Sequence, residues 1–309
     1  MLAIMNASIR TSRSLGRLIS AAAYVAALCV AVLVVRAVGI SHPLAALGLG
    51  TLLATVVIFA VSAAADNSSI YDPYWSLQPA AIAVYYLWTG WGEMGVRQIL
   101  ATALLFLYSV RLTSNFYRGW PGLSKEDFRY MSLRARAGRA YWPVSFVGIH
   151  LFPTVMVYLG CLPLYALTRS GAAGLNWLDA AGVLVSLVAI VLAYVADEQL
   201  RVFRRDPQNR GRGISSGLWA YSRHPNYLGE MATWWGLWLL ALAAGLGWWW
   251  TVIGAAAITL LFVFGSIPMM EKRSLATRAG YQEYREQTPA LLPSFRRGTM
   301  VAESDGTRT

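Results

Sequence analysis

The sequence predicts an all-α fold, a polytopic membrane helical bundle of about seven to eight transmembrane helices. Of the 309 residues, 57% are hydrophobic and 13% are charged, whereas about a quarter of the residues of an average soluble domain are charged. The apolar residues gather in long stretches, several of them near the roughly 17–25 residues that a helix needs to cross a bilayer. Most of the basic residues lie between these stretches, as is typical of membrane proteins.

Eight apolar stretches are expected to form the helices. The first follows three arginines and exceeds the roughly 7–15 apolar residues of a cleaved secretion signal, so we expect it to be retained as a helix. The third stretch is short, and three residues separate the last two. The stretches are 18–38, 43–65, 78–90, 95–111, 142–167, 178–196, 230–244 and 248–267.

The distribution of basic residues predicts the orientation of the chain. With both termini in the cytoplasm, 26 Lys and Arg residues lie almost entirely in the inner segments, and only Arg36, Arg97 and Arg169 fall near the outer face. This agrees with the positive-inside rule. We therefore expect a multi-pass integral protein of a bacterial inner membrane, in contact with membrane lipids. Topology also accounts for the net charge of +11, so we expect no nucleic-acid partner.

The inner segments are too short to form a separate soluble domain, and the sequence shows no internal repeat. Any chemistry must therefore come from helix ends and inner loops. The three histidines, His42, His150 and His224, lie far apart and lack the spacing of metal ligands, so no metal site is expected. The sequence carries no signal for an oligomeric state.

Polar residues gather at the inner end of the sixth stretch, in YVADEQLRVFRR. Tyr194, Asp197, Arg201 and Arg204 lie three or four residues apart and therefore share one helical face. Two interpretations stay open. The face either binds a ligand, or it is a solvated helix end in which Asp197 pairs with Arg201.

A second polar group stands before the seventh stretch, in GLWAYSRHPNYLGE. Pro225 is suited to the first turn of a helix, with His224 or Ser222 near the cap. Asn226 and Glu230 are then one turn apart. Polar side chains at a membrane helix are costly and are functional candidates by default.

The helix start that Pro225 predicts lies close to Arg212 and Arg223. Free backbone N–H groups and the helix dipole favour an anion there, such as a phosphate-bearing ligand. In the alternative interpretation, Glu230 marks the water boundary and the basic loop contacts lipid head groups.

Two further candidates belong to the third and fourth stretches. Tyr108 lies inside the fourth stretch, where a buried hydroxyl needs a partner. Asp72 lies in DNSSIYDPYWSLQP, with no Lys or Arg nearby in the sequence. An acid in such a place can have a raised pKa and act as a proton donor. A simple Asp-Pro turn is the alternative for Asp72.

Two motifs resemble those of a known family. WAYSRHPNYLGE, followed by an apolar helix, and EKRSLATRAGYQEYREQTPALLPSF near the end are similar to the steroid 5-alpha-reductase-like membrane enzymes, in particular to an uncharacterised bacterial branch. The resemblance covers 72–295, and its most specific part is the Asn-Tyr-x-Gly-Glu core. The wider superfamily includes the isoprenylcysteine carboxyl methyltransferases, which share an Arg-His-Pro-x-Tyr-x-Gly run and a similar ending.

The resemblance implies a cytoplasmic cofactor pocket that holds NADPH without a Rossmann domain. This is consistent with the lack of a Gly-x-Gly-x-x-Gly motif after a strand. The implied domains are 1–65 with N-terminal transmembrane helices, 66–295 with the catalytic region, and 296–309 as a disordered tail. Asn226 and Glu230 match the pair that holds the nicotinamide amide. The other implied cofactor-binding residues are Asp197, Arg204, Arg212, Tyr221, Arg223 and His224.

Tyr108 matches the family tyrosine that donates to the substrate ketone. In the steroid reductases a glutamate partners that tyrosine, but none stands at the matching place here, and Asp72 is the substitute that we expect. An extra N-terminal helix is a second departure from the family pattern. Both departures count against a strict steroid specificity.

The implied activity is that of an oxidoreductase that transfers a hydride from NADPH to the C=C bond of a lipophilic enone, steroid-like or another isoprenoid or lipid, which enters from the bilayer. An alternative is an S-adenosylmethionine-dependent methyltransferase that acts on a lipid-linked acceptor. A third class, a transporter or lipid-binding scaffold, would spread its polar groups along a midplane path. The polar groups here gather at the inner face instead.

Overall fold

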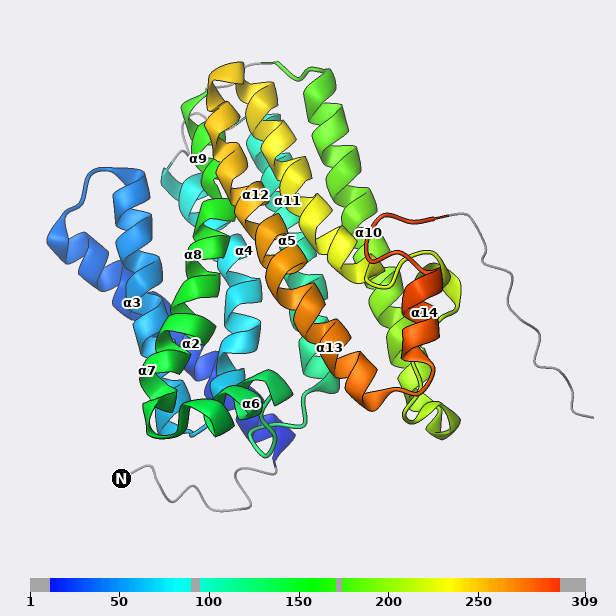
Figure 1. Cartoon of the computed structure of the whole chain (residues 1–309). Helices are drawn as coiled ribbons and strands as arrows, with labels where there is room; N and C mark the ends of the chain where they lie inside the picture. Colours follow the sequence, from blue (N-terminus) through cyan, green and yellow to red (C-terminus); the bar gives the residue numbers. More distant parts are fainter. Residues whose placement is uncertain (1–11, 90–94, 171–173, 295–309) are drawn as a thin grey trace, which may run out of the picture. The chain divides into compact units, whose positions relative to one another are not determined.

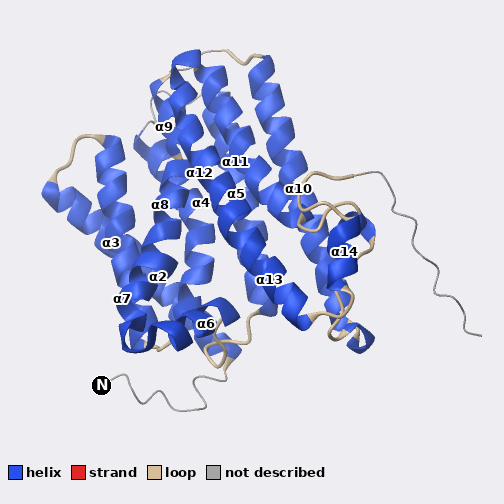
Figure 2. Cartoon of the chain, viewed as in Figure 1, coloured by secondary structure: helices blue, strands red, loops and turns tan. Residues whose placement is uncertain are grey.

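The computed structural model describes residues 12–89, 95–170 and 174–294. Within these ranges the regular secondary structure is helical and no strand occurs (Figures 1 and 2). One isolated bridge pairs Arg212 with Ala279. The chain divides into two compact units, which we call the larger unit (Met1–Leu187 and Thr233–Ile258) and the smaller unit (Val188–Ala232 and Thr259–Thr309).

The larger unit contains most of the long apolar helices, and the smaller unit contains the C-terminal ones. Helices α10 (Trp177–Arg205) and α11 (Pro225–Ala244) contribute residues to both units, and α12 (Val252–Leu260) ends at the boundary. The larger unit otherwise holds α2 (Arg13–Val38), α3 (Pro43–Ala64), α4 (Tyr71–Thr89), α5 (Val96–Gly119), α6 (Phe128–Ala137), α7 (Tyr141–Ser145), α8 (Phe152–Gly160) and α9 (Leu162–Arg169), and the smaller unit holds α13 (Ile267–Thr277) and α14 (Tyr281–Gln287).

Six helical segments of the described chain are long and apolar enough to cross a membrane, which indicates a multi-pass integral membrane protein. Described helix covers most of each of the eight predicted stretches, and residue 90, the last of the third stretch, lies outside the described residues. The third and seventh of them, α4 and α11, are not among the six segments. The segments are Arg13–Val38, Pro43–Ala64, Val96–Gly119, Phe128–Arg169, Trp177–Arg205 and Leu246–Thr277.

Helices α2 to α5 all belong to the larger unit. The predicted N-terminal region 1–65 and the catalytic region 66–295 stay predictions. The predicted tail 296–309 lies outside the described residues.

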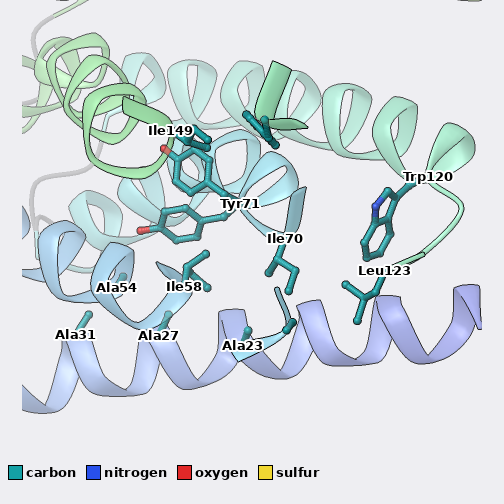
Figure 3. Packing of buried hydrophobic residues seen from close by; sticks show 13 residues of the cluster. Ala23, Ala27, Ala31, Ala54, Ile58, Ile70, Tyr71, Trp120, Leu123 and Ile149 are labelled. Carbon is teal, nitrogen blue, oxygen red and sulfur yellow. The ribbon is translucent and has the colours of Figure 1, made fainter. Parts of the chain in front are cut away.

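Small side chains let α2 pack closely on α3. Ala23, Ala27 and Ala31 follow one another at four-residue intervals along α2, and all three are buried. Figure 3 shows them beside Ala54 and Ile58 of α3. In a membrane, where lipid tails are as apolar as the side chains, such small residues allow backbones to approach and gain packing energy.

A buried ion pair joins the first turns of α5 and α10. Arg97 Nε lies 2.5 Å from Asp179 Oδ1, and Arg97 Nη2 lies 2.8 Å from Asp179 Oδ2. Both side chains are almost fully buried. The same guanidinium donates to the Gly174 carbonyl oxygen, and Asp179 accepts from the Asn176 backbone N–H. These bonds offset the cost of removing two charges from water.

Glycine allows α12 to touch the backbone of α8. A Cβ atom on Gly254 would come within 2.1 Å of the Leu159 carbonyl oxygen and within 2.7 Å of Gly160 Cα. A clash with backbone atoms cannot be relieved by a change of rotamer. Gly254 is therefore required by the packing of the larger unit.

We predict that Gly254→Ala destabilises the protein by about 1–3 kcal/mol or more, because the extra methyl group forces α8 and α12 apart. Thermal unfolding of the purified protein in detergent measures this loss. Gly148→Ala is the matched control, since a Cβ there would meet nothing within 4 Å. Equal unfolding temperatures for the two variants would contradict the close approach.

Candidate functional site

The candidate cofactor site lies in the smaller unit, where α10 and α11 run in opposite directions at very short range. A Cβ atom on Gly229 would come within 2.5 Å of the Ala189 carbonyl oxygen and within 2.8 Å of Ala193 Cβ. Only a glycine on one helix and small residues on the other permit this approach. The next turn of each helix brings Asp197 and Asn226 together.

Asn226 Nδ2 donates to Asp197 Oδ1 over 3.0 Å. Two residues that the sequence analysis chose from motifs 29 positions apart are therefore in contact. Arg201 pairs with Glu198, one turn before it on the same helix. In the alternative interpretation Asp197 pairs with Arg201, but in the structure Arg201 pairs with Glu198.

One polar atom of this pair lacks a hydrogen-bond partner. Asn226 Oδ1 is buried and has no hydrogen-bond partner among the described residues. A buried amide oxygen without a donor costs about 1–3 kcal/mol. A ligand that donates to this oxygen would recover that cost, so the asparagine is suited to recognising an amide or another N–H group.

The segment before α11 is pinned to the neighbouring helices through its main chain and its tryptophan. Trp219 Nε1 donates to the Ala196 carbonyl oxygen on α10 over 3.1 Å. The Tyr284 hydroxyl of α14 donates to the Trp219 carbonyl oxygen over 2.5 Å. The predicted helix start at Pro225 is confirmed, and the Ser222 hydroxyl accepts from the His224 backbone N–H.

Glu271 of α13 contacts three basic side chains of the site. Its Oε1 accepts from Arg223 Nε over 2.7 Å and lies 3.3 Å from His224 Nε2. Arg285 lies 3.5 Å from the other carboxylate oxygen. The buried carboxylate thus ties α13, α14 and the start of α11 to one another.

The N–H groups of Arg223 donate hydrogen bonds to other groups of the protein. Besides Glu271, its guanidinium donates to the carbonyl oxygens of Arg285 and Thr288. Its backbone N–H donates to the Pro289 carbonyl oxygen. Arg223 therefore holds the C-terminal segment against the site. The phosphate contact that the sequence suggested for it stays a prediction.

His224 lies flat against Tyr227, with ring centroids 5.3 Å apart and an interplanar angle of 10°. Burial lowers the pKa of His224, against the raising effect of Glu271. Burial therefore favours the neutral imidazole, which can donate and accept at the same time.

Two cavities of the smaller unit share the lining residues Leu200, Arg204, Ile214 and Arg278. The smaller cavity has a volume of about 60 Å³ and the larger one of about 240 Å³. The polar lining of the smaller cavity consists of Arg204, Arg223, His224, Asn226, Ser274, Arg278 and the hydroxyl-bearing Tyr227, Tyr281 and Tyr284.

Four arginines line the larger cavity, and none of its lining residues is acidic: Arg204, Arg210, Arg212 and Arg278. Burial lowers the pKa of Arg278, and the nearby charge of Arg273 lowers it further. Positive charge is therefore under-compensated here. An anion with several oxygens, such as a phosphate group, would relieve the repulsion among the guanidinium groups.

Tyr221 and Glu230 complete the predicted cofactor set. The Tyr221 carbonyl oxygen accepts from the Ser294 backbone N–H, so this residue also holds the C-terminal segment. Glu230 is buried on α11, one turn after Asn226. Neither residue lines the two cavities just described.

The predicted catalytic residues belong to the larger unit. Tyr108 of α5 is buried, and its ring meets the edge of the Trp234 ring with centroids 5.5 Å apart. The Arg111 guanidinium lies 5.7 Å from the centre of the Tyr108 ring.

Asp72 is buried in the first turn of α4 and is bonded to α6. Its carboxylate accepts a short hydrogen bond from the Tyr130 hydroxyl, and Arg129 Nη2 lies 3.7 Å away. Burial raises the pKa of Asp72 to about 6, although Arg129 and the Tyr130 hydrogen bond lower it. The raised pKa agrees with the sequence argument, but the tyrosine that Asp72 contacts here is Tyr130.

Several residues of these sites were not chosen from the sequence. Those of the smaller unit lie in EKRSLATRAGYQEYREQ, a stretch that carried the family resemblance without pointing to single side chains. Tyr130 and Arg129 lie in a loop of mixed charge, for which the sequence leaves two interpretations open: a surface helix or a segment that covers the cofactor. Only contacts between distant segments identify Glu271, Arg278, Tyr281, Tyr130 and Arg129.

We predict that Asp72→Asn stabilises the protein relative to wild type above pH 6 and has little effect at pH 4. The folded-state pKa of about 6 exceeds the unfolded value of about 3.9. The protonated carboxyl therefore contributes stability that is fully present below about pH 4 and lost as the pH rises through 6.

The stability difference between the two proteins should approach a few kcal/mol, since each pKa unit corresponds to about 1.4 kcal/mol. Unfolding midpoints in detergent between pH 4 and pH 8 measure it. Glu283→Gln, at an exposed position of α14, should show no such trend. A constant difference between Asp72→Asn and wild type would rule out the raised pKa.

Comparison with known proteins places the chain in a family. The chain is 29% identical over 262 residues to a Schizosaccharomyces pombe protein named "Uncharacterized protein C594.04c", and the match covers 77% of this chain and 76% of that protein. No solved structure matches the chain. The family model described as "Protein of unknown function (DUF1295)" matches residues 58–288, and that family includes steroid 5-alpha-reductase-like proteins. The chain therefore belongs to the DUF1295 family.

Proposed function

We propose that the protein is a membrane-bound reductase that uses NADPH to reduce the C=C bond of a lipophilic enone, steroid-like or another isoprenoid or lipid. The observation that carries the proposal is the pair of cavities in the smaller unit, with four arginines in one and the buried Asn226 amide beside the other. Membership of a family that includes steroid 5-alpha-reductase-like proteins supports the same reaction class.

The residues of the smaller unit suit the chemical groups of NADPH. The unpartnered Asn226 oxygen is an acceptor for a carboxamide N–H group, and the neutral His224 ring offers a further polar contact. Arg204, Arg212 and Arg278 supply charge for phosphate groups. NADPH is larger than either cavity, so we propose that it extends along both.

When bound, NADPH supplies the hydride. Tyr108 donates a hydrogen bond to the carbonyl oxygen of the substrate, on which negative charge develops. The apolar helices around Tyr108 exclude water and admit a substrate from the bilayer. Asp72, with its raised pKa, is our candidate for the acid group that supports proton transfer in the larger unit.

We predict that the purified protein binds NADPH and that Asn226→Ala and Arg212→Gln each weaken binding by about ten-fold or more. Asn226→Ala removes a hydrogen bond that the ligand would make to a buried amide oxygen, and Arg212→Gln removes a charge-assisted hydrogen bond to a phosphate group. Calorimetry with NADPH measures the effect. Gln208→Ala is the matched control, because this exposed amide lies beside the larger cavity without lining it.

Unchanged NADPH affinity in both variants would refute the assigned pocket. The same titration with S-adenosylmethionine tests the alternative function. Binding of S-adenosylmethionine without binding of NADPH would replace the reductase by the methyltransferase that acts on a lipid-linked acceptor.

We predict that Tyr108→Phe lowers the rate of enone reduction by about 10²–10³-fold while NADPH affinity stays at the wild-type value. The change removes the proposed donor to the developing oxyanion but keeps the ring that packs against Trp234. Substrate-dependent loss of NADPH absorbance with a panel of lipophilic α,β-unsaturated ketones measures the rate. A wild-type rate in this variant would exclude Tyr108 as the donor.

A further inference from the structure

The larger cavity of the smaller unit extends beyond the residues that it shares with the smaller cavity. Arg204 and Arg278, which we call the shared pair, line both cavities. Arg210 and Arg212, which we call the distal pair, line only the larger one. Asn226 lines only the smaller one. The shared pair therefore lies where the two cavities meet, and the distal pair lies in the part of the larger cavity away from Asn226.

The distal pair lies on a turn that is bonded to the segments on both sides of it. Asn209 Nδ2 donates to the Phe203 carbonyl oxygen of α10 over 2.9 Å, and the Arg212 backbone N–H donates to the Asn209 carbonyl oxygen over 3.1 Å. On the other side, the Ala279 backbone N–H donates to the Gly211 carbonyl oxygen over 3.0 Å. Gly211, between the two arginines, has a φ of 75°, a conformation that favours glycine. The turn is therefore held without the arginine side chains.

The charges of the distal pair are not compensated by the described part of the chain. Both residues are exposed, and neither side chain forms an ion pair with another described residue. Asp206, the nearest acid in the sequence, accepts from the Gln208 backbone N–H, and it does not line the cavity. Two guanidinium groups on one turn, with no acid in the lining, favour a ligand group of high negative charge.

The shared pair is placed differently. The Arg278 guanidinium lies 6.0 Å from the centre of the Tyr281 ring, and Tyr281 lines the smaller cavity but not the larger one. Arg204 and Arg278 are close enough for their charges to repel each other. The shared pair thus supplies a second centre of positive charge, which lies nearer to Asn226 than the distal pair does.

The order of charged groups in NADPH matches the order of the two arginine pairs. A pyrophosphate joins the nicotinamide half of NADPH to the adenosine half, and the adenosine ribose carries a further phosphate at its 2′ oxygen. With the carboxamide at Asn226, the pyrophosphate is the part that passes from one cavity to the other, at the shared pair. The 2′-phosphate is the one phosphate beyond it. This group is a monoester with a charge of about −1.5 to −2 near pH 7.

We propose that Arg210 and Arg212 bind the 2′-phosphate of NADPH and thereby distinguish NADPH from NADH, which lacks this group. The inference rests on the proposed function, because it takes the NADPH site in the two cavities as given. A planar guanidinium group suits the task, since it can donate two parallel hydrogen bonds to phosphate oxygens. The shared pair serves both nucleotides alike, because the pyrophosphate is common to NADPH and NADH. Arg210 lies outside the residues that the sequence motifs indicated.

Calorimetric titration of the full-length protein in detergent with NADPH and with NADH tests the assignment. We expect the wild type to bind NADPH about a hundred-fold more tightly than NADH, because each of two charge-assisted contacts contributes about ten-fold. Arg210→Gln and Arg212→Gln should each weaken NADPH binding by about ten-fold and leave NADH binding unchanged. Arg278→Gln, in the shared pair, should weaken the binding of both nucleotides by the same factor.

Lys272→Gln is the control for net charge. Lys272 is exposed on α13 and lines neither cavity, so this variant should bind both nucleotides as the wild type does. Equal affinity of the wild type for NADPH and NADH, a measurement that needs no variant, would overturn the assignment and leave the reductase proposal intact. A wild-type ratio of the two affinities in Arg210→Gln or in Arg212→Gln would do the same. Failure of the wild type to bind either nucleotide would instead refute the proposed function, and the assignment with it.

Discussion

The peptide backbone cannot find water inside a bilayer, so each of its polar groups must be satisfied within the protein. This constraint explains why the described secondary structure is helical and why the helices approach one another at glycine and alanine. Gly254 touches the backbone of α8, and Gly229 touches that of α10. Polar side chains are confined to a few clusters, each of which must satisfy its own hydrogen bonds or leave an atom for a ligand.

The smaller unit shows how such a cluster is divided between structure and binding. Arg223 donates to the Glu271 carboxylate and to nearby main-chain carbonyl oxygens, and these bonds hold the C-terminal segment in place. The arginines of the larger cavity have no acid among its lining residues. A basic residue is therefore a candidate for ligand binding when no carboxylate compensates it, whatever motif it belongs to.

Two buried polar side chains of the larger unit differ in how their hydrogen bonds are satisfied. Asp72 is satisfied by Tyr130 and Arg129, at the cost of a raised pKa. Gln78 instead has a buried side-chain oxygen without a hydrogen-bond partner among the described residues. The buried Arg97–Asp179 ion pair also leaves one such atom, Arg97 Nη1. An unsatisfied atom therefore does not by itself separate a ligand site from a structural cluster.

Hydropathy, which depends only on the order of residues, predicted the helical class and the apolar stretches, six of which correspond to described helical segments long and apolar enough to cross a membrane. Two sequence motifs carried the family resemblance. The helix start at Pro225 also followed from the sequence, because proline restricts its own backbone. Tertiary packing decided that Asp197 contacts Asn226. It also decided that Glu271 and Tyr130 belong to the polar clusters. Those contacts join residues 29 to 58 positions apart. A local sequence pattern does not show which distant side chains are buried together and satisfy each other's hydrogen bonds.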